Sequence, residues 1–390
     1  MKVNAYSERW LQRDFPWVYP KEVVGKRERG GSQVILEGPS GAKLGRAIAD
    51  DGWIAARVYR QDGGPLSQAW MDEVLDAALE HRQRVVGGDT TGYRLVHGEN
   101  DGLPGLRIDW WSHYAVLIAD TPAVGPLLPL VTDWLIRRLT PRGIYLSYRP
   151  DPRDDRDASR FQPPAGLLYG KAPPADVRVT ERGMGMLVRP HEGPDVGVYA
   201  DMREVRAWLE PYWGGTSVLN TFAYTGAFSV AAALGGAAEI TTVDLSPHYL
   251  ERAEANFRTN ELDPTPHTFL AMDTFKALDR FRRKGDRFDR VVLDPPSFSH
   301  SGEGRWSAKQ DYPRLVSAAA KVVAPGGWLI AATNQGDMSP KVFRGLVIDG
   351  LRKEGRVAQE LLWAHESPDF PALVSFPEGR YLKVGVWRLR

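Results

Sequence analysis

Short apolar runs alternate with segments of helical periodicity from about residue 185 to residue 390. Each run is followed by a segment in which apolar positions recur every three or four residues. The predicted strand and helix pairs are residues 217–220 with 227–234, 240–243 with 247–259, 268–271 with 274–282, and 290–293 with 312–323, before a last strand at 328–332. This alternation predicts an α/β fold with a parallel sheet covered on both faces. Ligands of such sheets bind beyond the carboxyl ends of the strands.

Two further regions precede this one. Residues 1–70 contain short β-like runs at 33–36 and 54–59, broken by glycine clusters, as in a small β-rich domain. Residues 71–180 combine predicted helices, one starting at 71 and one at 127–139, with strands at 106–110, 114–119 and 143–148. A polar, proline-rich stretch at 151–164 is expected to be an exposed connection. The chain is therefore predicted to form three domains, over residues 1–70, 71–180 and 185–390.

Composition narrows the class of protein. A chain of 390 residues with 43% hydrophobic and 25% charged residues is typical of a soluble protein of several domains. Lys+Arg (50) and Asp+Glu (49) nearly cancel, so any basic surface for nucleic acid must be local. The first residues lack the apolar segment of a signal peptide, and no apolar run is long enough to cross a membrane. We expect a cytoplasmic protein that does not contact membranes.

Cysteine is absent. This excludes disulfides, thiolate metal sites and any mechanism with a cysteine nucleophile. The eight histidines show no metal-ligand spacing, so no metal is expected.

The sequence Leu293-Asp294-Pro295-Pro296-Ser297-Phe298 ends an apolar run with an acid and two prolines. Proline lacks a backbone donor, so strand pairing must stop there. A carboxylate, a stiff turn and an aromatic ring together suit a flat ligand with polar edges, such as a nucleobase. An ordinary junction between strand and loop has the same pattern.

Acids end three successive predicted strands. Asp244 lies about 20 residues after the loop that follows the first strand, the spacing at which an acid binds a ribose diol. Asp273 and Asp294 end the next two strands, although each such acid is also a common helix cap or turn residue. The loop contains one glycine, Gly226, where a dinucleotide would need three, so a smaller anion such as a carboxylate fits better. A carboxylate, a ribose and an adenine are the parts of S-adenosylmethionine.

The third region resembles the class I S-adenosylmethionine-dependent methyltransferases, with their Rossmann-like fold. The whole chain resembles the bacterial large-subunit rRNA methyltransferases that place an N-terminal PUA domain and a small α/β middle domain before that catalytic domain. The motifs that carry the resemblance lie at Asn4, Arg9 and residues 13–18, at 92–106, 197–203, 222–226 and 243–244, and at 293–298.

This resemblance implies roles for individual residues. Phe222, Tyr224, Thr225 and Gly226 would hold the methionine part of the cofactor, Asp244 the ribose hydroxyls and Asp273 the adenine amino group, with Tyr199 and Arg203 closing over it. Packing between domains is the alternative for Tyr199 and Arg203. Asp294, which would also touch the cofactor, would line the pocket for the target base with Pro295, Pro296 and Phe298. The PUA domain implies binding to 23S rRNA, with Arg9, Arg13 and Lys21 as phosphate contacts.

The sequence departs from the relatives that make 5-methylcytosine. Those relatives carry a cysteine after the fifth strand, whereas this chain reads Ala332-Thr333-Asn334-Gln335-Gly336. Guanine N7 already has a lone pair and needs no covalent help, and a related branch that methylates this atom has Asn at that position. We therefore expect methylation of guanine N7, then of an exocyclic amine, and least of cytosine C5. Asn334 would position the base, or else cap the following turn.

Other functions stay open at this point. A non-catalytic RNA-binding or ribosome assembly factor would keep the fold without the chemistry. An oxidoreductase is disfavoured by the single-glycine loop, and a small-molecule methyltransferase by the N-terminal domain. A homodimer is one open oligomeric arrangement.

Overall fold

The computed structural model describes residues 1–149, 165–193, 195–296, 298–301 and 304–390, with only the backbone given for 298–301, 304 and 305. The predicted connection at 151–164 and Ser297 therefore lie outside the described residues. The chain divides into two compact units. Unit 1 contains Met1–Val179, Val188–Val196 and Pro368–Gly379, and unit 2 contains Thr180–Leu187, Gly197–Ser367 and Arg380–Arg390. No helix among the described residues is long and apolar enough to cross a membrane.

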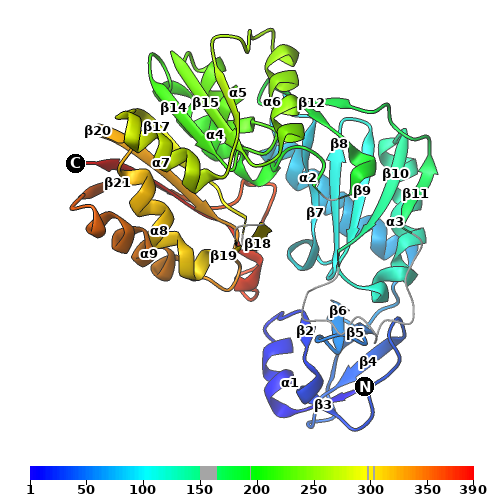
Figure 1. The fold of residues 1–390 in the computed structure, drawn as a ribbon. Helices are drawn as coiled ribbons and strands as arrows, with labels where there is room; N and C mark the ends of the chain where they lie inside the picture. Colours follow the sequence, from blue (N-terminus) through cyan, green and yellow to red (C-terminus); the bar gives the residue numbers. More distant parts are fainter. Residues whose placement is uncertain (150–164, 194, 297, 302–303) are drawn as a thin grey trace. The chain divides into compact units, whose positions relative to one another are not determined.

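Unit 2 is built on a seven-stranded sheet with the order β16-β15-β14-β17-β20-β22-β21 (Figure 1). Its strands are β14 (Ser217–Thr221), β15 (Glu239–Asp244), β16 (Thr268–Ala271), β17 (Phe288–Leu293), β20 (Val323–Thr333), β21 (Ala358–Ala364) and β22 (Lys383–Leu389). Five strands, β14 to β17 and β20, pair in parallel, and β22 runs antiparallel to both β20 and β21. The predicted α/β fold of the third region is confirmed.

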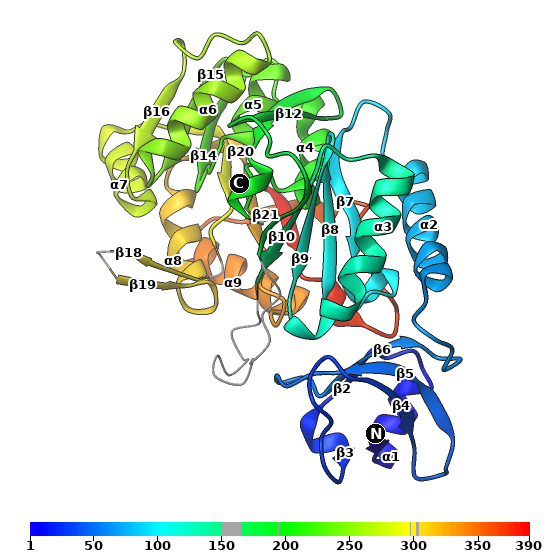
Figure 2. The same cartoon turned by 90° about the vertical axis from the view of Figure 1, so that its right-hand side faces the viewer.

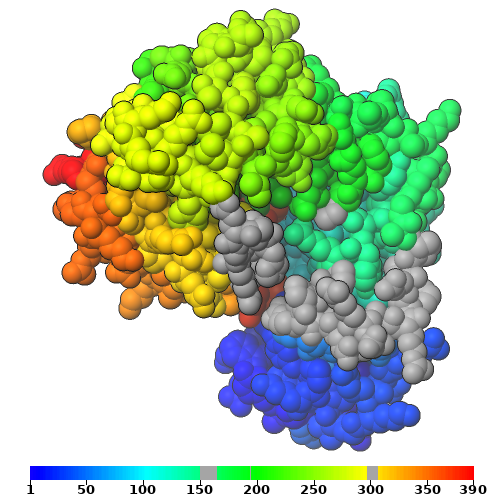
Figure 3. Space-filling view, in the orientation of Figure 1, coloured from blue at the N-terminus to red at the C-terminus, as the bar shows by residue number. Residues whose placement is uncertain are grey.

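Helices cover both faces of this sheet. They are α4 (Arg203–Leu209), α5 (Ala227–Leu234), α6 (Pro247–Thr259), α7 (Thr274–Lys284), α8 (Ala308–Ala320) and α9 (Pro340–Lys353). Leu219, Val291 and Leu329, on the three central strands, form one core with α7, α8 and α9. In the space-filling view, the part of the chain that contains these helices, yellow to orange, lies on one side of the molecule (Figure 3).

Helix α8 differs from the prediction at both ends. It begins at Ala308 rather than 312, after the hairpin of β18 (Phe298–Ser301) and β19 (Gly304–Ser307), and it ends at Ala320 rather than 323. Ala308, Tyr312 and Leu315 are all buried, so the apolar stripe starts one turn before Pro313, which lies inside the helix. Val323 instead begins β20, where it pairs with Phe288.

Unit 1 contains two sheets (Figure 2). The first has the order β2-β6-β5-β4-β1-β3 and carries helix α1 (Ala5–Leu11), and the second has the order β11-β10-β9-β8-β7 and packs against α2 (Gln68–Val85) and α3 (Leu128–Leu139). The strands of the first sheet are β1 (Lys2–Val3), β2 (Trp17–Val18), β3 (Val23–Val24), β4 (Gln33–Glu37), β5 (Lys43–Ala49) and β6 (Ala56–Arg60). Those of the second are β7 (Gly92–His97), β8 (Leu106–Trp111), β9 (Tyr114–Ala119), β10 (Gly143–Tyr148) and β11 (Gly166–Gly170). Strands β12 (Val177–Glu181) and β13 (Met184–Val188) form a separate pair. The predicted division at residue 70 stays a prediction.

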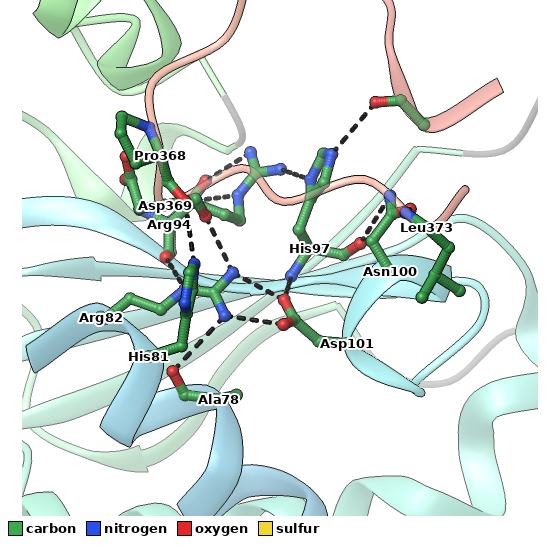
Figure 4. Close-up of polar contacts among 12 residues, drawn as sticks. Ala78, His81, Arg82, Arg94, His97, Asn100, Asp101, Pro368, Asp369 and Leu373 are labelled. Carbon is green, nitrogen blue, oxygen red and sulfur yellow. Dashed lines mark hydrogen bonds and ion pairs between the residues drawn. The ribbon is translucent and has the colours of Figure 1, made fainter. Parts of the chain in front are cut away.

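A segment from near the C-terminus belongs to unit 1. We call Pro368–Gly379 the strap, and Figure 4 shows how buried polar groups hold it. Asp369 Oδ2 accepts from the backbone N–H of Arg94 at 3.0 Å, and Arg82 Nη2 donates to the Asp369 carbonyl at 2.8 Å. Arg82 also forms two hydrogen bonds to Asp101, at 2.7 and 2.6 Å. Much of the sequence motif at 92–106 therefore serves to anchor the strap within unit 1.

Candidate active site

The loop at residues 222–226 links β14 to α5 and has an unusual backbone. Phe222, Tyr224 and Gly226 adopt positive φ values of 54°, 51° and 79°. For Phe222 and Tyr224, which are not glycine, such a backbone is strained and persists only where the surrounding structure holds it. The constraint comes from Thr225, whose hydroxyl donates to the Gly197 carbonyl and whose carbonyl accepts from Asn256 Nδ2 at 2.8 Å. The loop is thus held in one shape at the carboxyl edge of the sheet.

Gly226 permits this shape for two reasons. Its φ of 79° suits glycine, and a Cβ built there would lie 2.7 Å from the Ala253 Cβ on α6. Helix α5 can therefore begin directly after the loop and close to α6.

Asp244 joins the loop to the tip of β15. Its Oδ2 accepts from the Tyr224 N–H at 2.8 Å and its Oδ1 from the Ser246 N–H at 2.9 Å. Burial raises the pKa of this half-buried carboxyl group. Each oxygen has a second lone pair, so the carboxylate can also accept from the hydroxyl groups of a ligand.

Tyrosine rings form one side of the site. The Tyr224 ring centroid lies 5.4 Å from that of Tyr199 and 4.7 Å from that of Tyr249. Tyr199 is 45% exposed, whereas Arg203 is 2% exposed and its Nε lies 3.2 Å from Glu204 Oε1. Of the pair predicted to close over a cofactor, Tyr199 presents its side chain at the surface and Arg203 is buried.

Asp273 follows β16 and caps helix α7. Its Oδ1 accepts from the Lys276 N–H at 3.1 Å, which is the capping role considered for this acid. Next to Asp244 in the sequence, Leu245 is 62% exposed. An exposed leucine directly after Asp244 offers an apolar face to a planar ring, a feature that our sequence interpretation missed. The sequence pattern that could have revealed this feature is an apolar residue, Leu245, between the acid Asp244 and the helix-capping Ser246.

Asp294 directly follows β17, which pairs with β14 on the side opposite to β15. Burial and the charge of Asp201 raise the pKa of its carboxyl group to about 7, while the charge of Arg206 opposes this shift. Arg206 is itself buried and paired with Glu181, its Nε lying 3.0 Å from Glu181 Oε1. Asp294 therefore titrates far above the usual range of an aspartate.

The two prolines fix the turn after Asp294. Pro295 is buried, and the Pro296 carbonyl accepts from Trp306 Nε1 at 2.7 Å. The Phe298 side chain, predicted to line the base pocket, lies outside the described residues.

Groups next to Asn334 complete this edge of the sheet. Asn334 is exposed after β20, and Gln335 beside it is 5% exposed. Lys383 Nζ donates to the carbonyls of Gln335 at 2.7 Å and Tyr381 at 2.8 Å, and burial lowers the pKa of its ammonium group. The sequence interpretation missed Lys383, because only the antiparallel strand β22 brings it opposite Thr333.

The predicted RNA contacts lie in unit 1, where Arg9 on α1, Arg13 just after it and Lys21 are all exposed. Among the residues that the structure describes, no group of histidine, aspartate or glutamate side chains could hold a metal ion.

Comparisons with known proteins agree with this geometry. Residues 160–373 match the family model of S-adenosylmethionine-dependent methyltransferases. The chain is 34% identical to ribosomal RNA large subunit methyltransferase I of Aeromonas salmonicida, over 98% of this chain and 97% of that protein. It is 30% identical to the protein of the same name from Yersinia pseudotuberculosis, over 96% of each.

Solved structures lead to the same family. A methyltransferase crystallised with SAH superposes with a TM-score of 0.89 at 25% identity, over 100% of this chain and 99% of that one. A SAM-dependent methyltransferase from Streptococcus mutans gives a TM-score of 0.87, also at 25% identity and with the same coverage.

The residues of unit 2 fit S-adenosylmethionine. The constrained loop at 222–226 would hold the amino acid part, Asp244 would accept from the ribose hydroxyls, and Leu245 would offer an apolar face to the adenine. The chain therefore belongs to the S-adenosylmethionine-dependent methyltransferases, in the family of the enzymes named ribosomal RNA large subunit methyltransferase I.

Proposed function

We propose that this enzyme methylates a base of 23S rRNA in the cytoplasm, and that the acceptor atom is N7 of a guanine. The rRNA substrate is supported by relatives named ribosomal RNA large subunit methyltransferase I, which match nearly the whole chain. The choice of atom rests on one observation, the set of side chains at the carboxyl ends of β17 and β20, where the acceptor base would bind. That edge carries Asp294, Asn334 and Gln335, and the sequence contains no cysteine to activate cytosine C5.

The described groups suit guanine. Gln335 Oε1 is buried and has no hydrogen-bond partner within the described part of the chain, so it can accept from an N–H group on a base edge. Guanine presents two kinds of donor on its Watson–Crick edge, the N1–H and the 2-amino group. Lys383 holds the Gln335 backbone through its carbonyl and so keeps this acceptor in place.

S-adenosylmethionine supplies an electrophilic methyl group when it is bound. Our proposal gives the protein the task of holding the acceptor in line with that group, because positioning accounts for much of such catalysis. Guanine N7 loses no proton on methylation, and the purine becomes positively charged. Ionised Asp294 would stabilise that charge.

An exocyclic amine is the second candidate. Methylation of an amine releases a proton, and the pKa of Asp294, raised to about 7, suits a general base at neutral pH.

Nucleoside analysis of 23S rRNA distinguishes the candidates. Ribosomal RNA from a strain that lacks the gene is compared by mass spectrometry with RNA from its parent. We expect 7-methylguanosine to decrease, and to return with the wild-type gene but not with Asp294→Ala. Loss of an N-methylated exocyclic amine would support the second candidate, and loss of 5-methylcytidine would contradict both. Unchanged nucleosides would overturn the rRNA substrate.

A further inference from the structure

Helix α1 in unit 1 exposes aromatic and cationic side chains on one face. Arg9 and Trp10 follow Tyr6 at spacings of three and four residues, which place side chains toward the same side of a helix, and Arg13 lies in the turn just after α1. Tyr6 is 54% exposed and Trp10 39% exposed, and both arginines are exposed as well. The face that packs into the domain is instead formed by Ser7 and Leu11, at 2% and 1% exposure.

The exposed rings of Tyr6 and Trp10 pack against each other and against the half-buried ring of Phe15. The Trp10 ring lies 6.3 Å from Tyr6 and meets the Phe15 ring edge-on at 6.2 Å. The turn after α1 makes this possible, because the N–H groups of Arg13 and Phe15 both donate to the Trp10 carbonyl, at 3.0 and 3.1 Å.

Phe15 is backed in turn by Trp17 at 6.2 Å and by Phe376 of the strap at 5.9 Å. The exposed pair is therefore supported before any ligand arrives, which lowers the cost of ordering on binding.

Two arginines, Arg9 and Arg13, lie close to the exposed rings and could pair with the phosphates of a nucleotide whose base stacks there. The Arg13 guanidinium carbon is 5.7 Å from the centroid of the Trp10 ring, and Arg9 lies one helical turn after Tyr6 on α1. The nearby carboxylate of Glu8 is engaged by the Ser40 hydroxyl. Aromatic faces flanked by cations bind unpaired nucleotides, because the bases stack and the phosphates pair with the arginines. An apolar protein partner would have to bury both arginines without a counter-charge.

We propose that Tyr6, Arg9, Trp10 and Arg13 form a stacking surface for unpaired nucleotides of the RNA substrate. This α1 stacking surface deepens the proposed function, on which it rests, because it names single-stranded RNA as the form that unit 1 binds. A duplex hides its base faces and would gain only the phosphate contacts.

Binding to short RNAs tests the proposal on the full-length protein. Fluorescence anisotropy is measured with a single-stranded oligoadenylate and with an RNA duplex of equal length, at several salt concentrations. We expect the double variant Tyr6→Ala/Trp10→Ala to bind the single strand roughly 10- to 100-fold more weakly, with an unchanged salt slope and little change for the duplex. The variant Arg9→Ala/Arg13→Ala should instead lower the salt slope by about 1.4, since each phosphate contact to a single strand contributes about 0.7.

Matched variants separate stacking from loss of structure. Trp10→Phe keeps a ring and should retain most of the affinity. Tyr169→Ala removes a tyrosine that is 40% exposed elsewhere in unit 1, on β11, and should bind like the wild type. Equal affinity in Tyr6→Ala/Trp10→Ala, equal losses for strand and duplex, or the same loss in Tyr169→Ala would each overturn the proposal. Dissociation of a dimer by the double variant, with RNA affinity unchanged, would assign the surface to a second copy and overturn it too.

Methylation assays distinguish this proposal from the proposed function. If the wild type binds oligoadenylate through these rings but does not methylate 23S rRNA, only the proposed function fails. If the enzyme methylates 23S rRNA and Tyr6→Ala/Trp10→Ala leaves its KM for RNA unchanged, only the stacking surface fails.

Discussion

Asp294 changes its charge in the range where the enzyme would work, because burial and Asp201 raise its pKa to about 7. If the ionised carboxylate stabilises a positively charged methylated purine, the rate of methyl transfer should rise with pH to a plateau, with a midpoint near pH 7. Initial rates at saturating RNA and cofactor measure this profile. Asp294→Asn should lower the rate and flatten the profile, and a rate that falls through pH 7 would contradict the role of the ionised form.

The same carboxyl group predicts how stability depends on pH. Its pKa is about 7 in the folded protein against an ordinary 3.8, so between these values the folded state binds a proton that the unfolded state has lost. The contribution of Asp294 to the free energy of unfolding is therefore complete below about pH 4. It decreases as the pH rises, by up to about 1.4 kcal/mol per pH unit, until about pH 7. Urea unfolding at several pH values should show a smaller decrease for Asp294→Asn than for the wild type. If the free energy of unfolding depends on pH in the same way in both proteins, the pKa of Asp294 is not raised.

Asp244 connects the cofactor loop to the sheet, and this double role makes its replacement costly. In Asp244→Asn one of the two acceptors, for the Tyr224 N–H or the Ser246 N–H, becomes a donor, and the carboxylate predicted to bind the ribose hydroxyls loses its negative charge. We expect S-adenosylmethionine to bind about 10-fold or more weakly, as judged by titration calorimetry. Asp263→Asn is the matched control, because Asp263 also accepts from a backbone N–H, that of Thr265 at 2.9 Å, but lies in an exposed turn, and its effect should be smaller. Equal losses in both variants would assign Asp244 no special part.

At the scale of elements, α5 depends on Gly226 for its position against α6. Gly226→Ala would combine a strained positive φ with a contact of 2.7 Å to Ala253, whereas Gly285→Ala, after α7, has a similar φ of 81° and nothing within 4 Å of the new Cβ. We expect Gly285→Ala to cost about 1 kcal/mol and Gly226→Ala at least about 1 kcal/mol more, as measured by thermal unfolding. Gly226→Ala should also weaken cofactor binding, because it displaces the loop at 222–226. Equal stability of the two variants would show that α6 moves away from the Cβ of Gly226→Ala at no cost.

The periodic elements of unit 2 could be predicted because their signals are local. The strand at 217–220 and the helix at 227–234 agree with β14 and α5. What could not be predicted depends on distant pairing. Lys383 meets Gln335 only because β22 runs antiparallel beside β20, and the strap joins unit 1 only through contacts such as Asp369 with Arg94. Exposure of Tyr6 and Trp10 also depends on which face of α1 the domain buries.

At the scale of the whole molecule, each of the two units has a core of its own. The core of α2, α3 and the second sheet lies in unit 1, and that of α7, α8, α9 and the seven-stranded sheet lies in unit 2. The residues that fit S-adenosylmethionine all belong to unit 2. A change that destabilises unit 1 alone should therefore leave the affinity for the cofactor unchanged.

Asp101→Ala makes such a change. It leaves the Arg82 guanidinium, which is 1% exposed, without the carboxylate that neutralises it, and a buried charge that loses its partner costs about 3–5 kcal/mol. Arg137→Ala is the control within the same unit, because Arg137 forms two ion pairs at the surface, with Asp72 and with Asp133, and each is worth at most about 1 kcal/mol. Calorimetric unfolding should show a large loss of stability for Asp101→Ala and little for Arg137→Ala, while both bind S-adenosylmethionine like the wild type. If the cofactor affinity of Asp101→Ala falls together with its stability, the strap, which is covalently joined to unit 2 at Ser367 and Arg380, transmits the state of unit 1 to the cofactor site.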